Sequence, residues 1–525
     1  MGFVFQDDLM LANLTVRETL LFSARLRLPQ SMPRGDKEAK VDALLDLLGL
    51  TRVAHQPIGG VERRGVSGGE RKRAALGAEL VTGPALLFLD EPTSGLDAAA
   101  ALSLTLLLRA LAADSGTIFV AAIHQPRSSV FNLFDQVVML RRGRAAYVGP
   151  RAGLGPYLVA ATQVGCPPAD VAPADWALDL LADLGADADK LVEEWSSNRS
   201  PKEAPAAGDS IPLLARSSGS DGGGDEGEGR RRRRQRTRWA TSGAHQFRVL
   251  LERQLKEGRG SALNKVSFIQ CLAVSAIVCA LWWQTNNVND ILGFLFFVTI
   301  NQAFNVVQAM VKVFPAQRAL LVRERGAGYY RVGAYFLART LSDSLTSYIF
   351  PMLYALLCYT GTGVVSSAED FFTYMALFFS VIMAAQAYGL LLSSMFREVQ
   401  IATIVAFTSV LALLLIGGFY VENDRLPVGI RWLTNISFIY WGFTGMSVNV
   451  FSGKSFDCTM LETPDELGGG CPVSGDVILM ERSIKDLSAG RGATLGNCFL
   501  ALWVLTVGLR LLAFLVLRRA IKRSH

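Results

Sequence analysis

Six apolar stretches in the second half of the sequence limit what this chain can fold into more than any other feature. Each reaches or nearly reaches the roughly 20 residues that an α-helix needs to cross a bilayer. Half of all residues are hydrophobic and only 19% are charged, which excludes an ordinary soluble protein. We therefore predict an all-α membrane domain with six spans, at about residues 266–284, 291–311, 335–361, 371–396, 399–421 and 494–517.

The basic residues around these stretches predict the orientation of the membrane domain. The loops 285–290 and 362–370 carry no Lys or Arg, whereas basic residues follow the second stretch and the sixth. Lys and Arg concentrate in cytoplasmic loops. We therefore expect a multi-pass integral membrane protein with both termini and everything before the first span in the cytoplasm, and residues 422–491 on the opposite side.

The first part of the chain has the pattern of an α/β domain. Short apolar runs such as 85–90 and 117–123 alternate with stretches of helical periodicity, which is typical of a mainly parallel sheet covered by helices. We place this α/β domain at residues 1–190 and the membrane domain at 244–525. Residues 244–258 are expected to form an amphipathic helix that connects the two.

Residues 191–243 are predicted to be a disordered linker, because they are rich in Gly, Ser, Pro and charge. Seven arginines lie between Arg230 and Arg238. The chain has a formal net charge of +6, so the remaining 45 basic and 46 acidic side chains leave a net charge of −1. A basic cluster can bind nucleic acid, but in a membrane-bound chain we interpret it as a solvated segment attracted to anionic membrane lipids, and we expect no nucleic-acid partner.

The run from Val66 to Asp97 carries the strongest chemical signal in the chain. Its glycine pair after Ser67 begins an expected helix, where backbone N–H groups and the helix dipole favour a phosphate. The predicted strand that follows ends in Asp90 and Glu91, which places two carboxylates at the carboxyl edge of a parallel sheet, where ligands bind. These residues predict a phosphate site in which Asp90 holds the water shell of a magnesium ion and Glu91 polarises an attacking water.

Two further polar residues follow predicted strands. Gln6 comes directly after the apolar run 2–5, where it can contact the metal ion and the water. His124 ends the strand at 117–123, where it can meet a γ-phosphate. For His124 taken alone, a core or helix-capping role is the simpler interpretation, and its position downstream of Glu91 favours the catalytic one.

With these motifs, the chain resembles an ATP-binding-cassette (ABC) transporter of the White, or ABCG, subfamily. The resemblance covers nearly the whole chain and includes the order of the two domains. It implies ATP and Mg²⁺ as cofactors, catalytic roles for Glu91 and His124, and metal ligation by Asp90 and Gln6. The nucleotide-binding motifs of the family correspond here to Gln6 (Q-loop), to Ser67, Gly68, Gly69 and Glu70 (signature motif), to Leu86–Asp90 (Walker B) and to Ser94–Asp97, ending in Asp97 (D-loop).

The resemblance also implies a dimer. In this family each ATP binds between two cassettes, so we expect a homodimer, or a heterodimer with another ABCG half-transporter, that exports an amphipathic molecule such as a lipid, sterol, pigment precursor or drug. The expected fold is an incomplete α/β P-loop NTPase cassette followed by the six-helix membrane domain. Residues Arg323–Arg331 resemble the intracellular elbow through which cassette motion reaches the membrane; the alternative is a solvated basic loop.

One family motif is missing from the sequence. The P-loop, GxxxxGK followed by Ser or Thr, supplies most of the phosphate binding in such ATPases. Gly453-Lys454-Ser455 lacks the first glycine, because position 448 is Val, and it lies in the stretch expected outside. We expect that the chain begins after the P-loop. The alternatives are a silent or regulatory subunit, which completes a partner's ATP site through its signature motif, and a non-transporting remnant.

Four residues of the membrane domain resemble positions around the substrate cavity of the family's multidrug exporter. Asn301 and Phe304 lie in the second apolar stretch, and Phe419 and Tyr420 end the fifth, where the family has a bulky plug above the cavity. The alternatives are a helix-to-helix hydrogen bond for Asn301 and an interfacial aromatic belt for Phe419 and Tyr420.

Cysteines and charged residues of the membrane domain give three further predictions. The family often has a disulfide in its outside loop, which here implies a bridge between Cys458 and Cys471, with free thiols as the alternative. Arg339 and Asp343 are four residues apart and are expected to pair on one helix face. Arg510 is expected to extend its side chain to the cytoplasmic interface.

Overall fold

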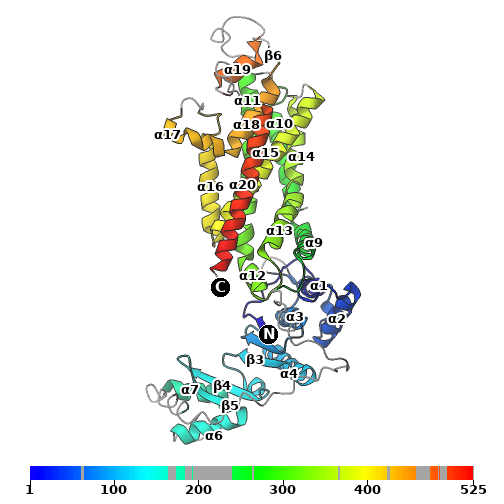
Figure 1. Ribbon diagram of the computed structural model, residues 1–525, viewed down its shortest axis with the longest axis vertical. Helices are drawn as coiled ribbons and strands as arrows, with labels where there is room; N and C mark the ends of the chain where they lie inside the picture. Colours follow the sequence, from blue (N-terminus) through cyan, green and yellow to red (C-terminus); the bar gives the residue numbers. More distant parts are fainter. Residues whose placement is uncertain are drawn as a thin grey trace, which may run out of the picture. The chain divides into compact units, whose positions relative to one another are not determined.

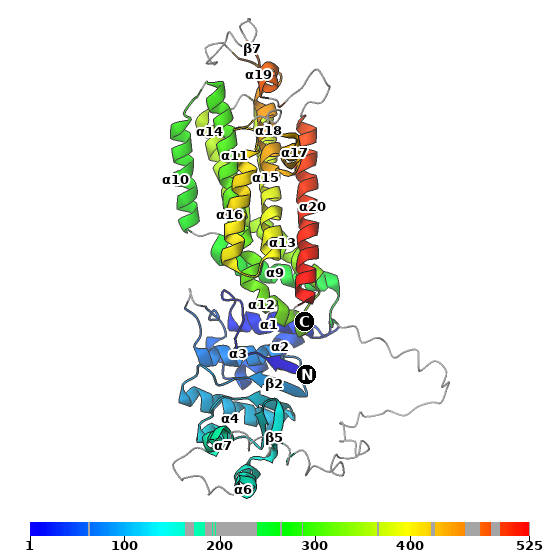
Figure 2. The same cartoon turned by 90° about the vertical axis from the view of Figure 1, so that its left-hand side faces the viewer.

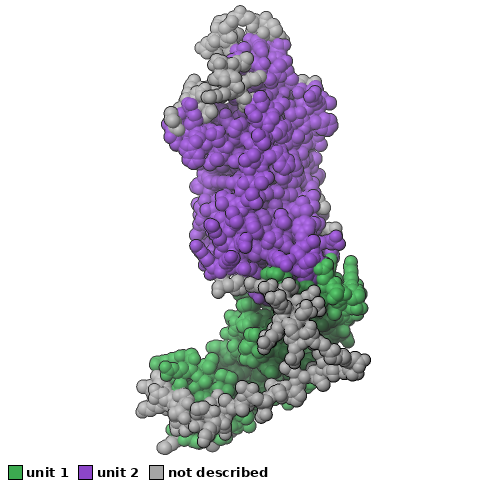
Figure 3. Space-filling model, viewed as in Figure 1, with its two compact units in different colours: residues 1–240 green, residues 241–525 purple. Residues whose placement is uncertain are grey.

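The chain folds as two compact units, Met1–Ala240 and Thr241–His525 (Figures 1 and 3). Most of the predicted linker, with Arg230–Arg238, and both Cys458 and Cys471 lie outside the described residues. The computed structural model describes residues 1–60, 64–162, 173–183, 192, 195, 239–262, 265–285, 287–364, 367–421, 426–456, 473–482, 484 and 494–523.

Unit 1 is built on a parallel sheet and an antiparallel hairpin. The strands are β1 (Gly2–Val4), β2 (Leu86–Asp90), β3 (Ile118–Ala122), β4 (Gln136–Arg141) and β5 (Arg144–Pro150). The parallel sheet has the order β1-β2-β3, and β4 pairs with β5. Its register sets Val4 beside Leu89 and Asp90 beside Ala122. The three strands therefore end at one edge of the sheet.

Helices pack against the sheet of unit 1 and form its main core. They are α1 (Val16–Arg27), α2 (Arg34–Leu47), α3 (Gly68–Leu80), α4 (Ala98–Ser115), α5 (Ser128–Phe131), α6 (Arg151–Thr162) and α7 (Pro173–Asp183). Thr15 and Ser67 explain where α1 and α3 begin, because each forms a capping box with a Glu three residues later. Leu20, Leu76 and Leu87 bring α1, α3 and β2 into one buried cluster.

The second face of the parallel sheet stays exposed among the described residues. Phe3, Ile118 and Val120 point away from the core cluster, and their exposed fractions are 40%, 62% and 42%. Parallel sheets in α/β proteins are normally covered on both faces. Among the described residues of unit 1, helices therefore cover only one face of the parallel sheet.

Helix α4 shows why hydropathy alone does not identify a membrane span. By length and composition it could cross a bilayer, as could Val288–Gly326, Val332–Thr362, Ala368–Met395 and Leu495–Lys522 of unit 2. However, α4 starts at an N-cap in the D-loop and ends at a left-handed glycine, and the leucines on one of its faces are buried in the core of unit 1. It is a core helix of the α/β unit.

Unit 2 is a bundle of long apolar helices (Figure 2). These are α10 (Lys265–Leu281), α11 (Val288–Val311), α12 (Val313–Gly326), α13 (Val332–Ser347), α14 (Ile349–Thr362), α15 (Ala368–Met395), α16 (Val399–Leu415) and α20 (Leu495–Lys522). Helix α15 packs against α11, α20 and α18 (Phe438–Phe451). The contact between α15 and α18 requires Gly442, because a Cβ there would lie 2.4 Å from a methyl carbon of Val381.

Two apolar stretches differ from their predicted helices. The third, predicted as one span over 335–361, is divided at Tyr348 between α13 and α14. Pro351 accounts for this break, because it has no N–H to bond the carbonyl of Ser347. The fifth, predicted to reach residue 421, ends its helix at Leu415, ahead of Gly418 with its left-handed φ of 88°.

The Gly453-Lys454-Ser455 run has a structural role. The Lys454 ammonium lies 2.9 Å from Asp370, the carboxylate in the first turn of α15. The side-chain amide of Asn449 donates to the backbone carbonyl of the same Asp370 at 2.9 Å. Lys454 therefore fixes the end of α18 to the start of α15, as expected for a residue outside any phosphate site.

A buried ion pair joins helix α9 (Gly243–Ala262) to α12. The Arg253 guanidinium donates twice to Glu324, at 2.7 and 3.0 Å, and both side chains are less than 7% exposed. The Tyr330 hydroxyl also donates to Glu324, and Arg253 lies over the Tyr330 ring. Burial lowers the pKa of Arg253, but the charge of Glu324 outweighs it, so the pKa is raised and Arg253 stays charged.

Inside the bundle, one charged pair agrees with its prediction and one residue does not. Arg339 donates to Asp343 at 2.9 Å, which confirms the predicted pair. Arg510 was predicted to extend toward the cytoplasmic interface, and this is wrong: it donates to Gln386 at 2.9 Å and to Ser344 at 3.3 Å. Helical side chains lean toward the helix N-terminus, which directs Arg510 away from the end of α20 and toward these acceptors.

The first prediction concerns the buried pair. Glu324→Gln removes the counter-charge and leaves Arg253 buried without compensation, so we expect unit 2 to lose about 3 kcal/mol of stability. The measurement is the midpoint of thermal unfolding of the full chain in detergent, followed by tryptophan fluorescence. Glu252→Gln is the matched control on α9, because Glu252 is 38% exposed and 3.8 Å from Lys256; it should cost less than about 1 kcal/mol. Equal losses would contradict the expectation.

Candidate functional site

The carboxyl edge of the parallel sheet gathers the predicted catalytic residues. Gln6 follows β1, Asp90 and Glu91 end and follow β2, and His124 follows β3. The ladder continues one step beyond β2, because the Glu91 N–H donates to the carbonyl of Ala122 at 2.9 Å. The Gln6 side-chain amide then donates to Glu91 Oε2 at 2.7 Å. Two residues separated by 85 positions in the sequence are thus in direct contact.

Backbone strain marks the same edge. Glu91 and Gln125 have φ values of 43° and 42°, in the left-handed region that favours glycine. Such conformations cost about 1–3 kcal/mol each for non-glycine residues and concentrate at functional sites. Here they occur directly after β2 and directly after His124, where each strand turns sharply out of the sheet.

Glu91 and His124 line a common cavity of about 280 Å³, together with Ser94, Leu96 and Arg127. A carboxylate that accepts one hydrogen bond retains acceptor sites for a water molecule. A histidine that lines the same cavity can donate to an anionic oxygen. The arrangement is therefore suited to holding a water molecule beside an anionic group.

The residues at this edge fit a magnesium ion. Mg²⁺ is usually bound by one or two protein oxygens together with water and substrate phosphates. Asp90 supplies a half-buried carboxylate, and the Gln6 amide oxygen remains as an acceptor because its nitrogen is the atom that bonds Glu91. Among the described residues, no group of three or more His, Cys, Asp or Glu could by itself hold a metal ion.

The predicted signature motif is a pre-formed helix N-terminus. The Ser67 N–H and hydroxyl each donate to Glu70 at 2.8 Å, and Ser67 Oγ accepts the Glu70 N–H at 3.4 Å. A Cβ added to Gly68 would lie 3.8 Å from Leu96, and one added to Gly69 would lie 3.6 Å from Ala100. The signature motif therefore lies against the D-loop and the start of α4.

Asp97 caps the neighbouring helix. Its Oδ1 accepts the N–H of Ala100 at 2.7 Å, which fixes the first turn of α4. The N-termini of α3 and α4 consequently lie side by side, as the Gly69–Ala100 contact requires. Asp97 acts here as a cap in its own cassette.

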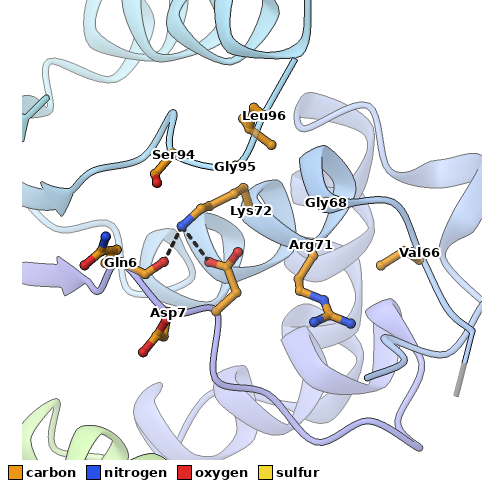
Figure 4. A pocket seen from close by; sticks show the side chains of 10 residues that line it. Gln6, Asp7, Val66, Gly68, Arg71, Lys72, Ser94, Gly95 and Leu96 are labelled. Carbon is orange, nitrogen blue, oxygen red and sulfur yellow. Dashed lines mark hydrogen bonds and ion pairs between the residues drawn. The ribbon is translucent and has the colours of Figure 1, made fainter. Parts of the chain in front are cut away.

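A second cavity, of about 520 Å³, lies between α3, the Q-loop and the D-loop (Figure 4). The Lys72 ammonium, 6% exposed, donates to the backbone carbonyl of Gln6 at 2.5 Å and lies 3.4 Å from Asp8. This cavity and the smaller one share Ser94 and Leu96. Within one chain, the signature helix and Glu91 therefore open onto different cavities. The larger cavity is lined by Gln6, Asp7, Asp8, Val66, Gly68, Arg71, Lys72, Ser94, Gly95 and Leu96.

Lys72 belongs to none of the predicted motifs, although its position in the sequence carries a signal. Lys72, Leu76 and Glu79 recur at the spacing of one helix face, and all three are buried. Glu79 is paired with Arg27 at 2.9 Å. A charged residue on an otherwise apolar helix face requires a buried partner. For Lys72 this partner is the Q-loop.

The four predicted cavity residues of unit 2 form two groups along α11. Phe419 stacks on Phe296 at 4.8 Å between ring centroids, and Tyr420 meets Phe296 edge-on at 5.6 Å. Asn301 accepts a hydrogen bond from its neighbour Gln302 at 3.3 Å, and Phe304 meets Phe407 of α16 edge-on at 5.7 Å. Phe296 and Phe304 are eight residues apart on α11, which separates the groups by about 12 Å along the helix.

The sequence matches known families in both units. Residues 1–94 match the ABC transporter family, and residues 245–451 match the ABC-2 type transporter family. ABC transporter G family member 22 of Arabidopsis thaliana is 36% identical over 475 residues, which cover 84% of this chain and 61% of that protein. Member 14 of the same family and organism is 31% identical over 529 residues, covering 99% of this chain and 78% of that protein.

A mammalian relative is similar to the same extent. The broad substrate specificity ATP-binding cassette transporter ABCG2 of Rattus norvegicus is 32% identical over 487 residues, covering 87% of this chain and 72% of that protein. The α/β unit with its strand-edge carboxylates and the apolar helix bundle thus define an ABC ATPase domain joined to a membrane domain, in an integral membrane protein. The chain belongs to the G family of ABC transporters.

This family membership confirms the predicted resemblance and fold class. The chain spans 61% of the length of member 22. The residue roles, the domain boundaries and the incomplete state of the cassette stay predictions.

The second prediction separates capping from chemistry at Ser67. Thr15 and Ser67 both close capping boxes, so Thr15→Ala and Ser67→Ala should each destabilise unit 1 by about 1 kcal/mol. If Ser67 also contacts nucleotide, Ser67→Ala alone should lower ATP hydrolysis, by at least about tenfold. The measurements are thermal unfolding and phosphate release by the full chain in detergent. A parallel fall in hydrolysis for both variants would assign Ser67 a capping role only.

Proposed function

We propose that this chain is an ABCG-type half-transporter that works as a dimer and couples ATP hydrolysis to export of an amphipathic molecule. The observation that carries the proposal is the 2.7 Å hydrogen bond from Gln6 to Glu91, at a sheet edge that also presents His124. A site of this kind in a chain with a membrane helix bundle supports hydrolysis in the service of transport. The lipid, sterol, pigment precursor and drug classes all remain within the proposal.

In the proposed mechanism, Glu91 accepts a proton from the attacking water, and Gln6 orients its carboxylate. His124 donates a hydrogen bond to an oxygen of the terminal phosphate, across the cavity that it shares with Glu91. Asp90 and the Gln6 amide oxygen would hold Mg²⁺, which supplies charge neutralisation on the phosphates. Gln6 would hold the metal ion through its amide oxygen, while its amide nitrogen donates to Glu91 and orients that carboxylate.

The separation of the two cavities supports a dimeric site. Gly68 of the signature motif lines the larger cavity, whereas Glu91 lines the smaller one. In the proposal, the signature motif of one cassette and the Walker B edge of another enclose one ATP. The partner is a second copy of this chain or another ABCG half-transporter.

The membrane domain supports the proposed direction and substrate class. The distribution of Lys and Arg supports a cytoplasmic position for the ATPase domain and both termini, with the bundle in contact with membrane lipids. Aromatic residues at Phe304, Phe419 and Tyr420, with Asn301 as a polar neighbour, suit an amphipathic molecule. One relative is named a transporter of broad substrate specificity, which supports the same class here.

The third prediction tests the coupling. Glu91→Gln keeps a side chain that can accept from Gln6 but removes the proton acceptor, so ATP hydrolysis should fall by at least about 100-fold while nucleotide binding is retained. Transport of rhodamine 123 into inside-out proteoliposomes should fall with it. Asp42→Asn is the surface control in the same unit, because Asp42 is exposed, contacts Arg17 at 2.7 Å and lines neither cavity. Transport that continues without hydrolysis would contradict the proposal.

The fourth prediction tests the cavity residues. Phe304→Ala removes an aromatic surface from the proposed substrate path, so the KM for rhodamine 123 transport should change by at least about threefold at unchanged basal ATP hydrolysis. Phe372→Ala is the matched control, because Phe372 is 69% exposed at the start of α15. If the unsubstituted chain and both variants have the same KM, Phe304 does not contact the transported molecule.

A regulatory subunit is the second candidate, and one observation favours it. Ser67–Glu70 is intact and pre-formed at the start of α3, so it is suited to completing a partner's ATP site whether or not Glu91 acts in hydrolysis. Co-expression with a family member that carries a P-loop distinguishes the two functions. For a regulatory subunit, Ser67→Ala lowers hydrolysis by the pair and Glu91→Gln leaves it unchanged. For an active half-transporter, both substitutions lower it.

A further inference from the structure

Lys72 is the buried cation of the signature helix that no role above explains. It lies on α3, five residues after Ser67, and only 6% of it is exposed. Its ammonium donates to the backbone carbonyl of Gln6 at 2.5 Å and lies 3.4 Å from Asp8 Oδ1 (Figure 4). Both contacts are with the loop that follows β1, 64 to 66 residues earlier in the sequence.

Because Lys72 is buried, its charge costs free energy unless these contacts are kept. A charged group removed from water is costly unless it is paired and hydrogen-bonded, and a lysine side chain also loses rotamer freedom when it is fixed. Asp8 supplies the counter-charge and is itself only 12% exposed. The Q-loop backbone and the signature helix therefore hold each other at this point, and neither can shift without disturbing the charge.

A continuous series of contacts leads from Lys72 to the catalytic edge. Lys72 fixes the carbonyl of Gln6, and the side chain of the same Gln6 donates to Glu91 at 2.7 Å. Gln6 thus accepts a hydrogen bond from Lys72 at its backbone carbonyl and donates one to Glu91 from its side-chain amide. A movement of α3 that displaces the Gln6 carbonyl therefore also shifts the Gln6 side-chain amide relative to the Glu91 carboxylate.

The neighbouring cation is directed elsewhere. Arg71 donates to the carbonyls of Ile58 and Gly59, at 3.1 and 2.7 Å. The far end of α3 is held by the pair between Arg27 and Glu79. Among the described residues of α3, Lys72 is the charged side chain that contacts the Q-loop.

We propose that Lys72 is a positioning residue, which couples the position of the signature helix to the orientation of Glu91 through Gln6. When the signature helix moves as nucleotide is engaged, Lys72 carries the displacement to the Q-loop and sets the carboxylate for its reaction with water. The catalytic part of this inference rests on the proposed function. The mechanical part, that Lys72 holds the Q-loop, does not.

The mechanical part is tested by amide hydrogen exchange of the full chain in detergent. Lys72→Met keeps the apolar stem and removes the charge, so the peptide that covers residues 5–9 should exchange about tenfold faster, because local opening there loses its buried contact. Lys72→Arg should restore most of the protection. The peptide that covers α1 is the internal reference for global unfolding.

Lys37→Met is the matched control. Lys37 is 3% exposed on α2 of the same unit and lines neither cavity. It should leave exchange at residues 5–9 unchanged. Unchanged exchange in Lys72→Met, or an equal increase in Lys37→Met, would overturn the proposal.

The catalytic part is tested by a double-substitution cycle in ATP hydrolysis. Lys72→Met should lower kcat about tenfold or more and change the KM for ATP less than about twofold, because Lys72 is predicted to act after binding. If Lys72 acts through Gln6, Lys72→Met added to Gln6→Ala should cause no further loss. Multiplicative losses would show an independent role and overturn the coupling. If the unsubstituted chain hydrolyses no ATP when it is co-expressed with a family member that carries a P-loop, the proposed function fails, while the exchange result still decides whether Lys72 holds the Q-loop.

Discussion

The parallel register of three short strands is the constraint on which the ATPase unit depends. Because β1, β2 and β3 run in the same direction, Gln6, Glu91 and His124 reach one sheet edge from positions far apart in the sequence. The geometry of the edge is then completed by local features: left-handed residues after two strands and capped helices beside them. The residues of this site are far apart in the sequence, and backbone hydrogen bonds between the strands bring them together.

Buried charge organises the membrane unit in the same way. Arg253 with Glu324, and Arg339 with Asp343, join or stabilise helices at positions where an unpaired charge would be expensive. Among the described residues, the hydrogen-bond acceptors of Arg510 are the neutral side chains of Gln386 and Ser344. The Arg253–Glu324 pair and the Arg510 hydrogen bonds connect different helices and so fix which helix faces meet. Apolar surfaces alone determine this weakly in a membrane, because lipid and side chains are similarly apolar.

Motif and hydropathy were sufficient to predict the two units, the family and the strand ends that carry Asp90, Glu91 and His124. The missed features depend on contacts between distant segments. The buried face of α3 could have suggested a partner for Lys72, but nothing local identifies Gln6 and Asp8 as that partner. The direction of Arg510 depended on acceptors that α13 and α15 bring to it. The break at Tyr348 could have been predicted from Pro351, which removes one helical hydrogen bond.

Whether α4 is counted as a membrane span decides whether the number of spans is odd or even. That number determines if the two ends of the chain lie on the same side of the membrane. By length and composition α4 could be a span, whereas α10 and α16, with 17 residues each, are shorter than the other candidates. Among the described residues this gives five candidate spans, an odd number, which would leave the two ends of the chain on opposite sides of a bilayer. Helix α4 packs in the α/β core and is not a span. When it is left out and the two shorter apolar helices of the described bundle are included, the number of spans is even. The side assigned to the C-terminus thus depends on the packing of a helix that never enters the membrane unit.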